Sequence, residues 1–228
     1  MDKYLTVFTS ILEVLGNYLL FYVLLSFNRN FQDIKSSKKL YIVKNVVKSF
    51  VLLYVSIIAT SDLYVYFLTN QINMERIYYY ASMYVANDIL ALLIVPNLPK
   101  TTKIHHQITT LFLVYTLHID YNDITNVGQL LFIYTIFSSY TFLVNFYLGI
   151  RFLKDEKNNY LNEIIEYSRV SAYVIYKYSC VSNWTIQGII LLYRAYIGAY
   201  NIHYILYLGL LYFIIKDDLI LMSWLKHG

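Results

Sequence analysis

Residues 78–117 read YYYASMYVANDILALLIVPNLPKTTKIHHQITTLFLVYTL, and this stretch decides the fold. Its first apolar run carries Asp88, a turn with two prolines and two lysines follows, and His105 and His106 open the next apolar run. Proline ends a helix because it lacks the backbone N–H and clashes with the preceding turn. The stretch therefore predicts a helix, a short turn and a second, antiparallel helix. Ionisable groups inside apolar helices are costly in a membrane and mark functional sites, so we expect a site around these three side chains.

The composition is that of a polytopic helical membrane protein. Of the 228 residues, 58% are hydrophobic and only 14% are charged, whereas a soluble domain is about 25% charged. The apolar runs are longer than the roughly ten residues of a membrane β-strand, and they are apolar on all sides. In lipid the backbone must satisfy its own hydrogen bonds, so the runs predict an all-α transmembrane bundle.

Seven apolar runs approach the length of about 20 residues that a membrane-spanning helix needs. They cover residues 4–27, 40–68, 77–95, 104–119, 126–152, 171–193 and 197–215. A charged linker at 154–159 and an amphipathic stretch to residue 169 precede the sixth run. Because the sequence has neither an internal repeat nor a Gly/Ser-rich linker, we expect one domain over residues 1–228, with residues 1–30 as a peripheral first helix.

Lysine and arginine are concentrated in alternate loops. The loops after the first, third and fifth runs contain Arg29, Lys35, Lys38, Lys39, Lys100, Lys103, Arg151, Lys154 and Lys157. The loops after the second and sixth runs contain only Arg76 and Arg194. Short basic loops remain on the cytosolic side of a membrane, so we expect a lumenal N-terminus and a cytosolic C-terminus. The net charge of +4 lies mostly in these loops and implies no nucleic-acid partner.

The central polar groups allow a functional and a structural interpretation. Tyr80, Tyr84 and Asp88 are spaced four residues apart and so share one helix face. His106 shares a face with Thr109, and adjacent histidines on a helix point about 100° apart, so we expect only one of the pair to face a cavity. In the functional interpretation a histidine acts as general base in a cavity open to the cytosol, and Asp88 orients it. In the structural interpretation a buried Asp88 is bonded to tyrosines, and the histidines sit at the membrane interface.

Other polar positions carry weaker signals. Lys44 and Lys48 lie four residues apart near the cytosolic end of the second run. They could contact a phosphate or a CoA group, or they could snorkel to lipid headgroups. Asn145, Asn183 and Gln187 could form interhelical hydrogen bonds or contact a ligand.

Several function classes leave no trace in the sequence. It contains no Gly-rich phosphate loop, no nucleophile elbow and no Cys/His metal spacing. Adjacent histidines do not readily chelate one ion, so we expect neither a metal nor a resident cofactor. The single cysteine, Cys180, cannot form an intrachain disulfide. Without an arginine ladder or a selectivity filter, the chain is a poor candidate for an ion channel.

The Asp–loop–His-His arrangement resembles the TLC-domain family, which includes ceramide synthases and the translocating-chain-associating membrane protein. The resemblance covers residues 38–216 and is clearest over residues 84–111. There Asp88, His105 and His106 occupy the family's most recurrent positions.

The resemblance weakens further along the chain. Gly128 fits the small residue that opens the family's next helix, and a Phe-Leu-Asn-like pattern follows in degenerate form at Phe142, Leu143 and Asn145. Ceramide synthases also carry a second His-Asp pair and a further Asp one helix on. The corresponding residues here are Thr135, Ile136 and Ser139. The second half of the family's acyl-transfer site is therefore absent.

The resemblance implies a six-helix ring around a lipid-sized cavity, one peripheral helix, and an endoplasmic-reticulum-like membrane. We expect a protein that binds or handles a membrane lipid and influences lipid or sphingolipid composition, and it could form a homo-oligomer. The expected lipid contacts are Tyr80, Tyr84, Thr109 and Asn145.

Two alternatives stay open. An acyl-CoA-dependent N-acyltransferase would use His105, His106 and Asp88 for catalysis, with acyl-CoA as co-substrate near Lys44 and Lys48. A structural or trafficking factor would use the same polar residues only to hold helices together.

Overall fold

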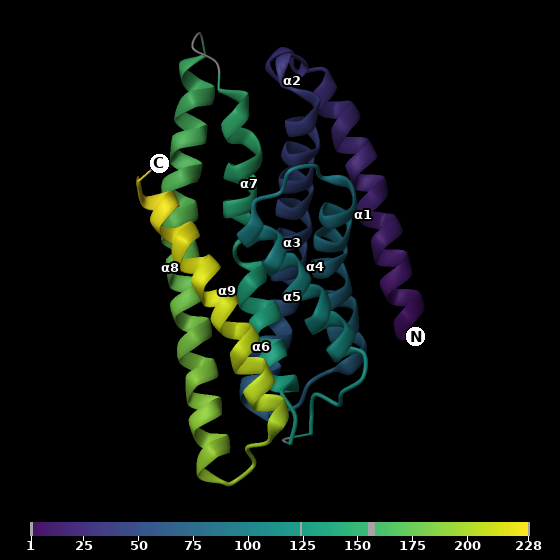
Figure 1. The fold of residues 1–228 in the computed structure, drawn as a ribbon, viewed down its shortest axis with the longest axis vertical. Coiled ribbons are helices and arrows are strands. Elements are labelled where there is room, and N and C mark those ends of the chain that lie inside the picture. The colour runs from purple at the N-terminus through teal and green to yellow at the C-terminus, as the bar shows by residue number, and fades with distance from the viewer. Residues whose placement is uncertain (1, 124, 155–157, 228) are drawn as a thin grey trace.

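A computed structural model describes residues 2–123, 125–154 and 158–227, and this part of the chain is helical without any strand (Figure 1). In chain order the elements are α1 (Lys3–Ser26), α2 (Arg29–Asp33), α3 (Ser36–Thr69), α4 (Met74–Ile94), α5 (Lys100–Thr116), α6 (Gly128–Ser139), α7 (Phe142–Ile150), a 3-10 turn (Arg151–Leu153), α8 (Asn159–Tyr196) and α9 (Ile202–His227). The expected all-α class is confirmed. The charged linker predicted at 154–159 falls partly outside the described residues.

Three of these helices, α1, α3 and α4, are long and apolar enough to cross a membrane. Helix α6, together with α7 and the 3-10 turn that follows α7, would form a fourth span, with a bend of 42° between α6 and α7. By contrast, α5 has only 17 residues, and three consecutive charged residues, Lys216, Asp217 and Asp218, interrupt the apolar run of α9. The structure therefore supports a membrane protein, whereas seven spans and a ring of six helices stay predictions.

The single helix predicted over residues 126–152 is in fact broken after Ser139. The hydroxyl of Ser139 donates to the carbonyl of Ile136 at 2.7 Å, and that of Thr141 donates to the carbonyl of Ser138 at 2.6 Å. The backbone N–H of Val144 then bonds the carbonyl of Thr141, three residues earlier. Short hydroxyl side chains compete for local carbonyls and bend helices, a signal that hydropathy does not carry.

The last two predicted helices are too short. The amphipathic stretch before residue 169 and the run at 171–193 form one helix, α8, and α9 continues well beyond residue 215. The chain reverses between them at Gly198, whose φ of 70° is left-handed. The N–H of Ala199 there bonds the carbonyl of Arg194, as at many helix C-termini. Hydropathy placed these ends wrongly because charged residues inside a helix resemble a loop: Glu163 and Glu166 are exposed on α8, and Asp218 is buried on α9.

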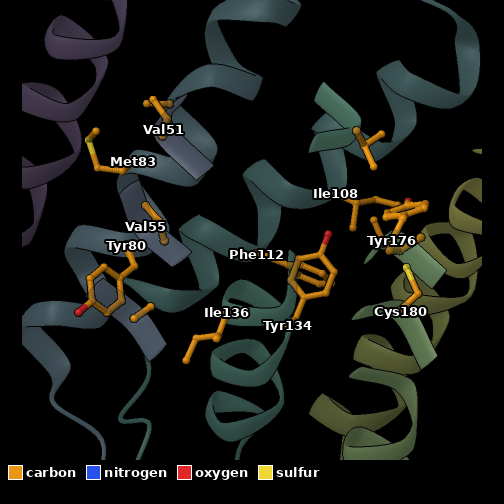
Figure 2. Packing of buried hydrophobic residues seen from close by; sticks show 14 of the residues in the cluster. Val51, Val55, Tyr80, Met83, Ile108, Phe112, Tyr134, Ile136, Tyr176 and Cys180 are labelled. Atoms are coloured by element: carbon orange, nitrogen blue, oxygen red, sulfur yellow. The ribbon is translucent and has the colours of Figure 1, made fainter. Parts of the chain in front are cut away.

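Helix α3 lies at the centre of the bundle and contacts α1, α4, α6 and α7, while α1 lies at the edge (Figure 1). One cluster of buried hydrophobic residues draws on all nine α-helices of the described chain. Figure 2 shows the middle of this core, where the rings of Phe112 and Tyr134 meet edge to face with centroids 5.5 Å apart.

Helices α3 and α7 pack closely against each other at Gly149. A Cβ atom on Gly149 would lie 2.7 Å from Cγ2 of Val46 and 3.2 Å from its backbone nitrogen. It would also lie 3.3 Å from the carbonyl oxygen of Ile42. Because backbone atoms cannot give way as a flexible side chain can, glycine is required for this helix pair to pack.

We predict that Gly149→Leu lowers the free energy of unfolding by about 1–3 kcal/mol, the usual cost of overpacking. Thermal unfolding in detergent would measure this, since 1 kcal/mol shifts the midpoint by about 2–4 °C in a chain of this size. Gly188→Ala is the control, because nothing lies within 4 Å of a Cβ at Gly188. An unchanged midpoint for Gly149→Leu would contradict the packing described.

Candidate functional site

A buried charge cluster joins α3, α4 and α5 around Asp88, which is completely buried. The ammonium group of Lys48 on α3 forms an ion pair with its Oδ1 atom. The hydroxyl of Thr109 on α5 donates to its Oδ2 atom at 2.8 Å. Burying an ion pair is tolerable only when each charge finds a partner and the remaining lone pairs are bonded, and Asp88 meets both conditions.

The imidazole of His106 is the fourth member of this cluster. Its Nδ1 atom lies 3.0 Å from Oδ1 of Asp88, although the geometry is not that of a hydrogen bond. Its Nε2 atom has no hydrogen-bond partner among the described residues, and the whole residue is only 2% exposed. Buried polar nitrogens rarely lack a partner. An imidazole with a carboxylate on one side and a free nitrogen on the other can accept a proton or bind a polar ligand group.

His106 faces a cavity of about 290 Å³ inside the bundle. The side chains around it come from α3, α4, α5, α6, α7, α8 and α9, and many are aromatic or polar, among them Tyr84, Tyr134 and Tyr176. Ligand pockets usually range from about 300 to 1,000 Å³. The cavity is therefore large enough for a lipid headgroup or part of one chain, but not for a whole two-chain lipid.

His105 lines the same cavity as His106 and contacts the last helix. Its Nδ1 atom lies 3.2 Å from Oδ2 of Asp217 on α9, and the two imidazole rings are 5.8 Å apart at 87°. The sequence predicts that one histidine faces a cavity and that the other faces a neighbouring helix or the interface. His105 does contact the neighbouring helix α9, but both histidines line the cavity, which extends from Lys48 on α3 to Asp217 on α9.

The structure brings most of the other predicted contacts to this place. Tyr84 and Asn145 line the cavity, while Thr109 lies behind it against Asp88. Lys44 and Lys48 also line the cavity, with only 3% and 5% of their surfaces exposed. Neither lysine therefore snorkels to lipid headgroups, because each is enclosed by neighbouring helices.

Tyr80 is placed elsewhere. Its hydroxyl donates to the carboxylate of Asp62 and accepts a hydrogen bond from Nε of Arg76 at 2.8 Å. In Figure 2 it lies on the opposite side of the core from Tyr176 and Cys180, two residues that line the cavity. Tyr80 and Asp88 share a helix face, but they are eight residues apart, which is about 12 Å along the helix axis. They therefore belong to different parts of the core.

Sequence reasoning missed the acidic pair on α9. Asp217 contacts His105, and Asp218 accepts a hydrogen bond from the hydroxyl of Tyr176 at 2.7 Å. A signal was present, since the apolar run resumes at residues 219–225 and places the pair inside a helix. Among the described residues, no group of three His, Cys, Asp or Glu side chains could hold a metal ion.

The polar residues of α8 mainly connect helices. The Nε2 atom of Gln187 donates to Asn183 at 2.7 Å, and the hydroxyl of Tyr207 on α9 donates to Gln187 at 2.7 Å. The guanidinium of Arg194 donates to the side chain of Gln129 on α6. The structural interpretation of Gln187 is thus confirmed, while Asn183 also lines the cavity.

Comparison of the chain with known proteins found no matching family model, no matching curated protein and no matching solved structure. The resemblance to the TLC-domain family, which rests on Asp88, His105 and His106, stays a prediction.

We predict that Asp88→Asn lowers the free energy of unfolding by about 3–5 kcal/mol, because it leaves the Lys48 ammonium buried without a counter-charge. Adding Lys48→Met should restore part of this loss, since the unpaired charge is then removed. Denaturant unfolding in micelles would measure both.

Glu166→Gln is the matched control for this charge change, because Glu166 pairs with Arg169 on an exposed surface. Exposed pairs contribute less than about 1 kcal/mol. If Asp88→Asn were no more destabilising than Glu166→Gln, the buried ion pair could not have the role assigned to it.

Proposed function

We propose that this chain is a multi-pass membrane protein that holds the polar end of a lipid in its interior cavity. The observation that supports this most directly is the cluster of Lys48, Asp88 and His106 beside a cavity within a bundle of apolar helices. Ionisable groups in such a bundle face a polar pathway or a binding site. A headgroup offers the hydrogen bonds and charges that these side chains can match, and lipid is the solvent of the bundle.

The proposed orientation places the cavity at the cytosolic face. Three basic connections meet at one end of the molecule. The Lys38 ammonium lies 5.2 Å from the ring centroid of Phe152, and the side chain of Asn30 donates to the carbonyl of Leu153 at 3.0 Å. Pro99, between α4 and α5, lines the same cavity. Basic connections are retained on the cytosolic side, so the N-terminus would be lumenal and the C-terminus cytosolic.

The family resemblance adds an endoplasmic-reticulum-like membrane and a role in lipid or sphingolipid composition to this proposal. A homo-oligomer stays a prediction.

The second candidate is an acyl-CoA-dependent N-acyltransferase, and the free Nε2 atom of His106 favours it. In this reaction Nε2 of His106 removes a proton from an amine as the amine nitrogen attacks the thioester carbonyl carbon. The carbon–sulfur bond then breaks, and the imidazolium returns the proton to the departing CoA thiolate. Asp88 would hold the imidazole in place from its Nδ1 side.

Native mass spectrometry of protein purified in mild detergent should detect co-purifying lipid, and Asn145→Trp should remove it by filling the cavity. Leu192→Trp is the control, because Leu192 is 73% exposed on α8 and does not line the cavity. Wild-type protein that carries no lipid would contradict the proposal and favour a structural or trafficking role.

For the second candidate, we expect His106→Ala to abolish transfer of a radiolabelled acyl group from acyl-CoA to a long-chain base. His118→Ala should retain the activity, because His118 is exposed and bonds only the carbonyl of Val114. Wild-type protein without turnover, or an active His106→Ala variant, would rule out this chemistry.

A further inference from the structure

Lys44 is a buried lysine without an anionic partner among the described residues. It is 3% exposed, and its ammonium nitrogen donates only to the neutral side-chain amide of Asn45, at 3.3 Å. No carboxylate of the described residues lies within ion-pair distance of it, in contrast to Lys48 one turn later. A buried charge without a counter-charge is strongly unfavourable, so an anion from outside the chain would complete this position.

Arg151 is a second cation without an anionic partner among the described residues, although its side chain as a whole is only partly buried. Its Nε atom is buried and has no hydrogen-bond partner, and it forms no ion pair within the described chain. The guanidinium carbon lies 4.4 Å from the ring centroid of Trp224 and 4.7 Å from that of Phe152. Aromatic faces can hold the planar guanidinium while its N–H edge stays available to a phosphate or carboxylate.

The two cations lie on neighbouring elements and line the same cavity. The ring of Tyr41 packs edge to face against Phe152 with centroids 5.9 Å apart, and the Lys44 ammonium lies 6.0 Å from the Tyr41 centroid. Lys44 therefore flanks the Tyr41 ring and Arg151 flanks the Phe152 ring, which Lys38 also approaches. The close approach of α7 to α3 at Gly149, two residues before Arg151, produces this arrangement.

Among the residues that the structure describes, the carboxylates near the cavity already have other partners. Asp88 pairs with Lys48, Asp217 contacts His105, and Asp218 accepts from Tyr176. None of them neutralises Lys44 or Arg151.

We propose that Lys44 and Arg151 form a subsite for the phosphate group of a lipid headgroup. The proposal rests on the function proposed above, in which the cavity receives the polar end of a lipid. Arginine offers a fork of donors that fits two phosphate oxygens, and lysine supplies a point charge. The cavity volume of about 290 Å³ suits a headgroup, which leaves the acyl chains in the surrounding bilayer.

The test uses the full chain in neutral detergent and measures binding from the rise in thermal unfolding midpoint with probe concentration. Three probes separate the contributions: lysophosphatidic acid, a monoacylglycerol with the same acyl chain, and inorganic phosphate. We expect lysophosphatidic acid to bind most tightly. Lys44→Met and Arg151→Met should each weaken its binding about tenfold or more, the usual effect of losing a charged hydrogen bond.

Two further variants control for indirect effects. Lys103→Met removes an exposed lysine that does not line the cavity and should leave binding unchanged. Arg151→Lys keeps the charge and should retain part of the preference for lysophosphatidic acid. Each variant is compared with its own probe-free midpoint, so a change in stability alone does not register as a change in binding.

The outcomes separate this subsite from the function on which it rests. If lysophosphatidic acid and monoacylglycerol bind equally and the cationic variants change neither, the phosphate subsite is wrong while the lipid cavity stands. If no lipid binds, the proposed function fails as well. If inorganic phosphate binds as tightly as lysophosphatidic acid, the subsite recognises a free anion, and its assignment to a lipid headgroup is overturned.

Discussion

The ion pair between Lys48 and Asp88 is the constraint on which the rest of the structure depends. Asp88 is completely buried and Lys48 is nearly so, and separating the pair would leave both charges uncompensated. Helices α3 and α4 therefore cannot slide past each other by a turn. Thr109 fixes α5 to the same carboxylate, so three helices share one register. The orientation of His106, and hence the position of its free nitrogen, follows from that register.

The two lysines of α3 show why sequence alone could locate the site but could not complete it. Their spacing of four residues placed them on one face, and this proved correct. Which partner each lysine finds depends on how far α4 is shifted along the axis of α3, and the local sequence pattern does not determine this shift. The two lysines are one helical turn apart, so Lys48 forms an ion pair with Asp88, whereas Lys44 bonds only the side-chain amide of Asn45.

Features with a strong local cause were predictable. The prolines at 96 and 99 end one helix and precede the next, and Asp88 with the His pair drew attention to the part of the chain that forms the candidate site. Features that depend on tertiary contact were not. The break after Ser139 comes from hydroxyl groups that bond nearby carbonyls, and the acidic pair of α9 is sheltered by His105 and Tyr176. A hydropathy profile does not register these contacts. It therefore predicted one helix over residues 126–152, where the structure has α6 and α7, and it ended the last helix at residue 215, although α9 continues to His227.

The glycine contact between α3 and α7 holds one wall of the cavity in place. Gly149 packs directly on the backbone of Val46, so the segment that carries Arg151 is held close to α3. On the other side, α9 is connected to α5 by the contact between Asp217 and His105, and its Trp224 ring packs against the Arg151 guanidinium. The cationic side is therefore preorganised, and little conformational entropy remains to be lost there when a ligand arrives.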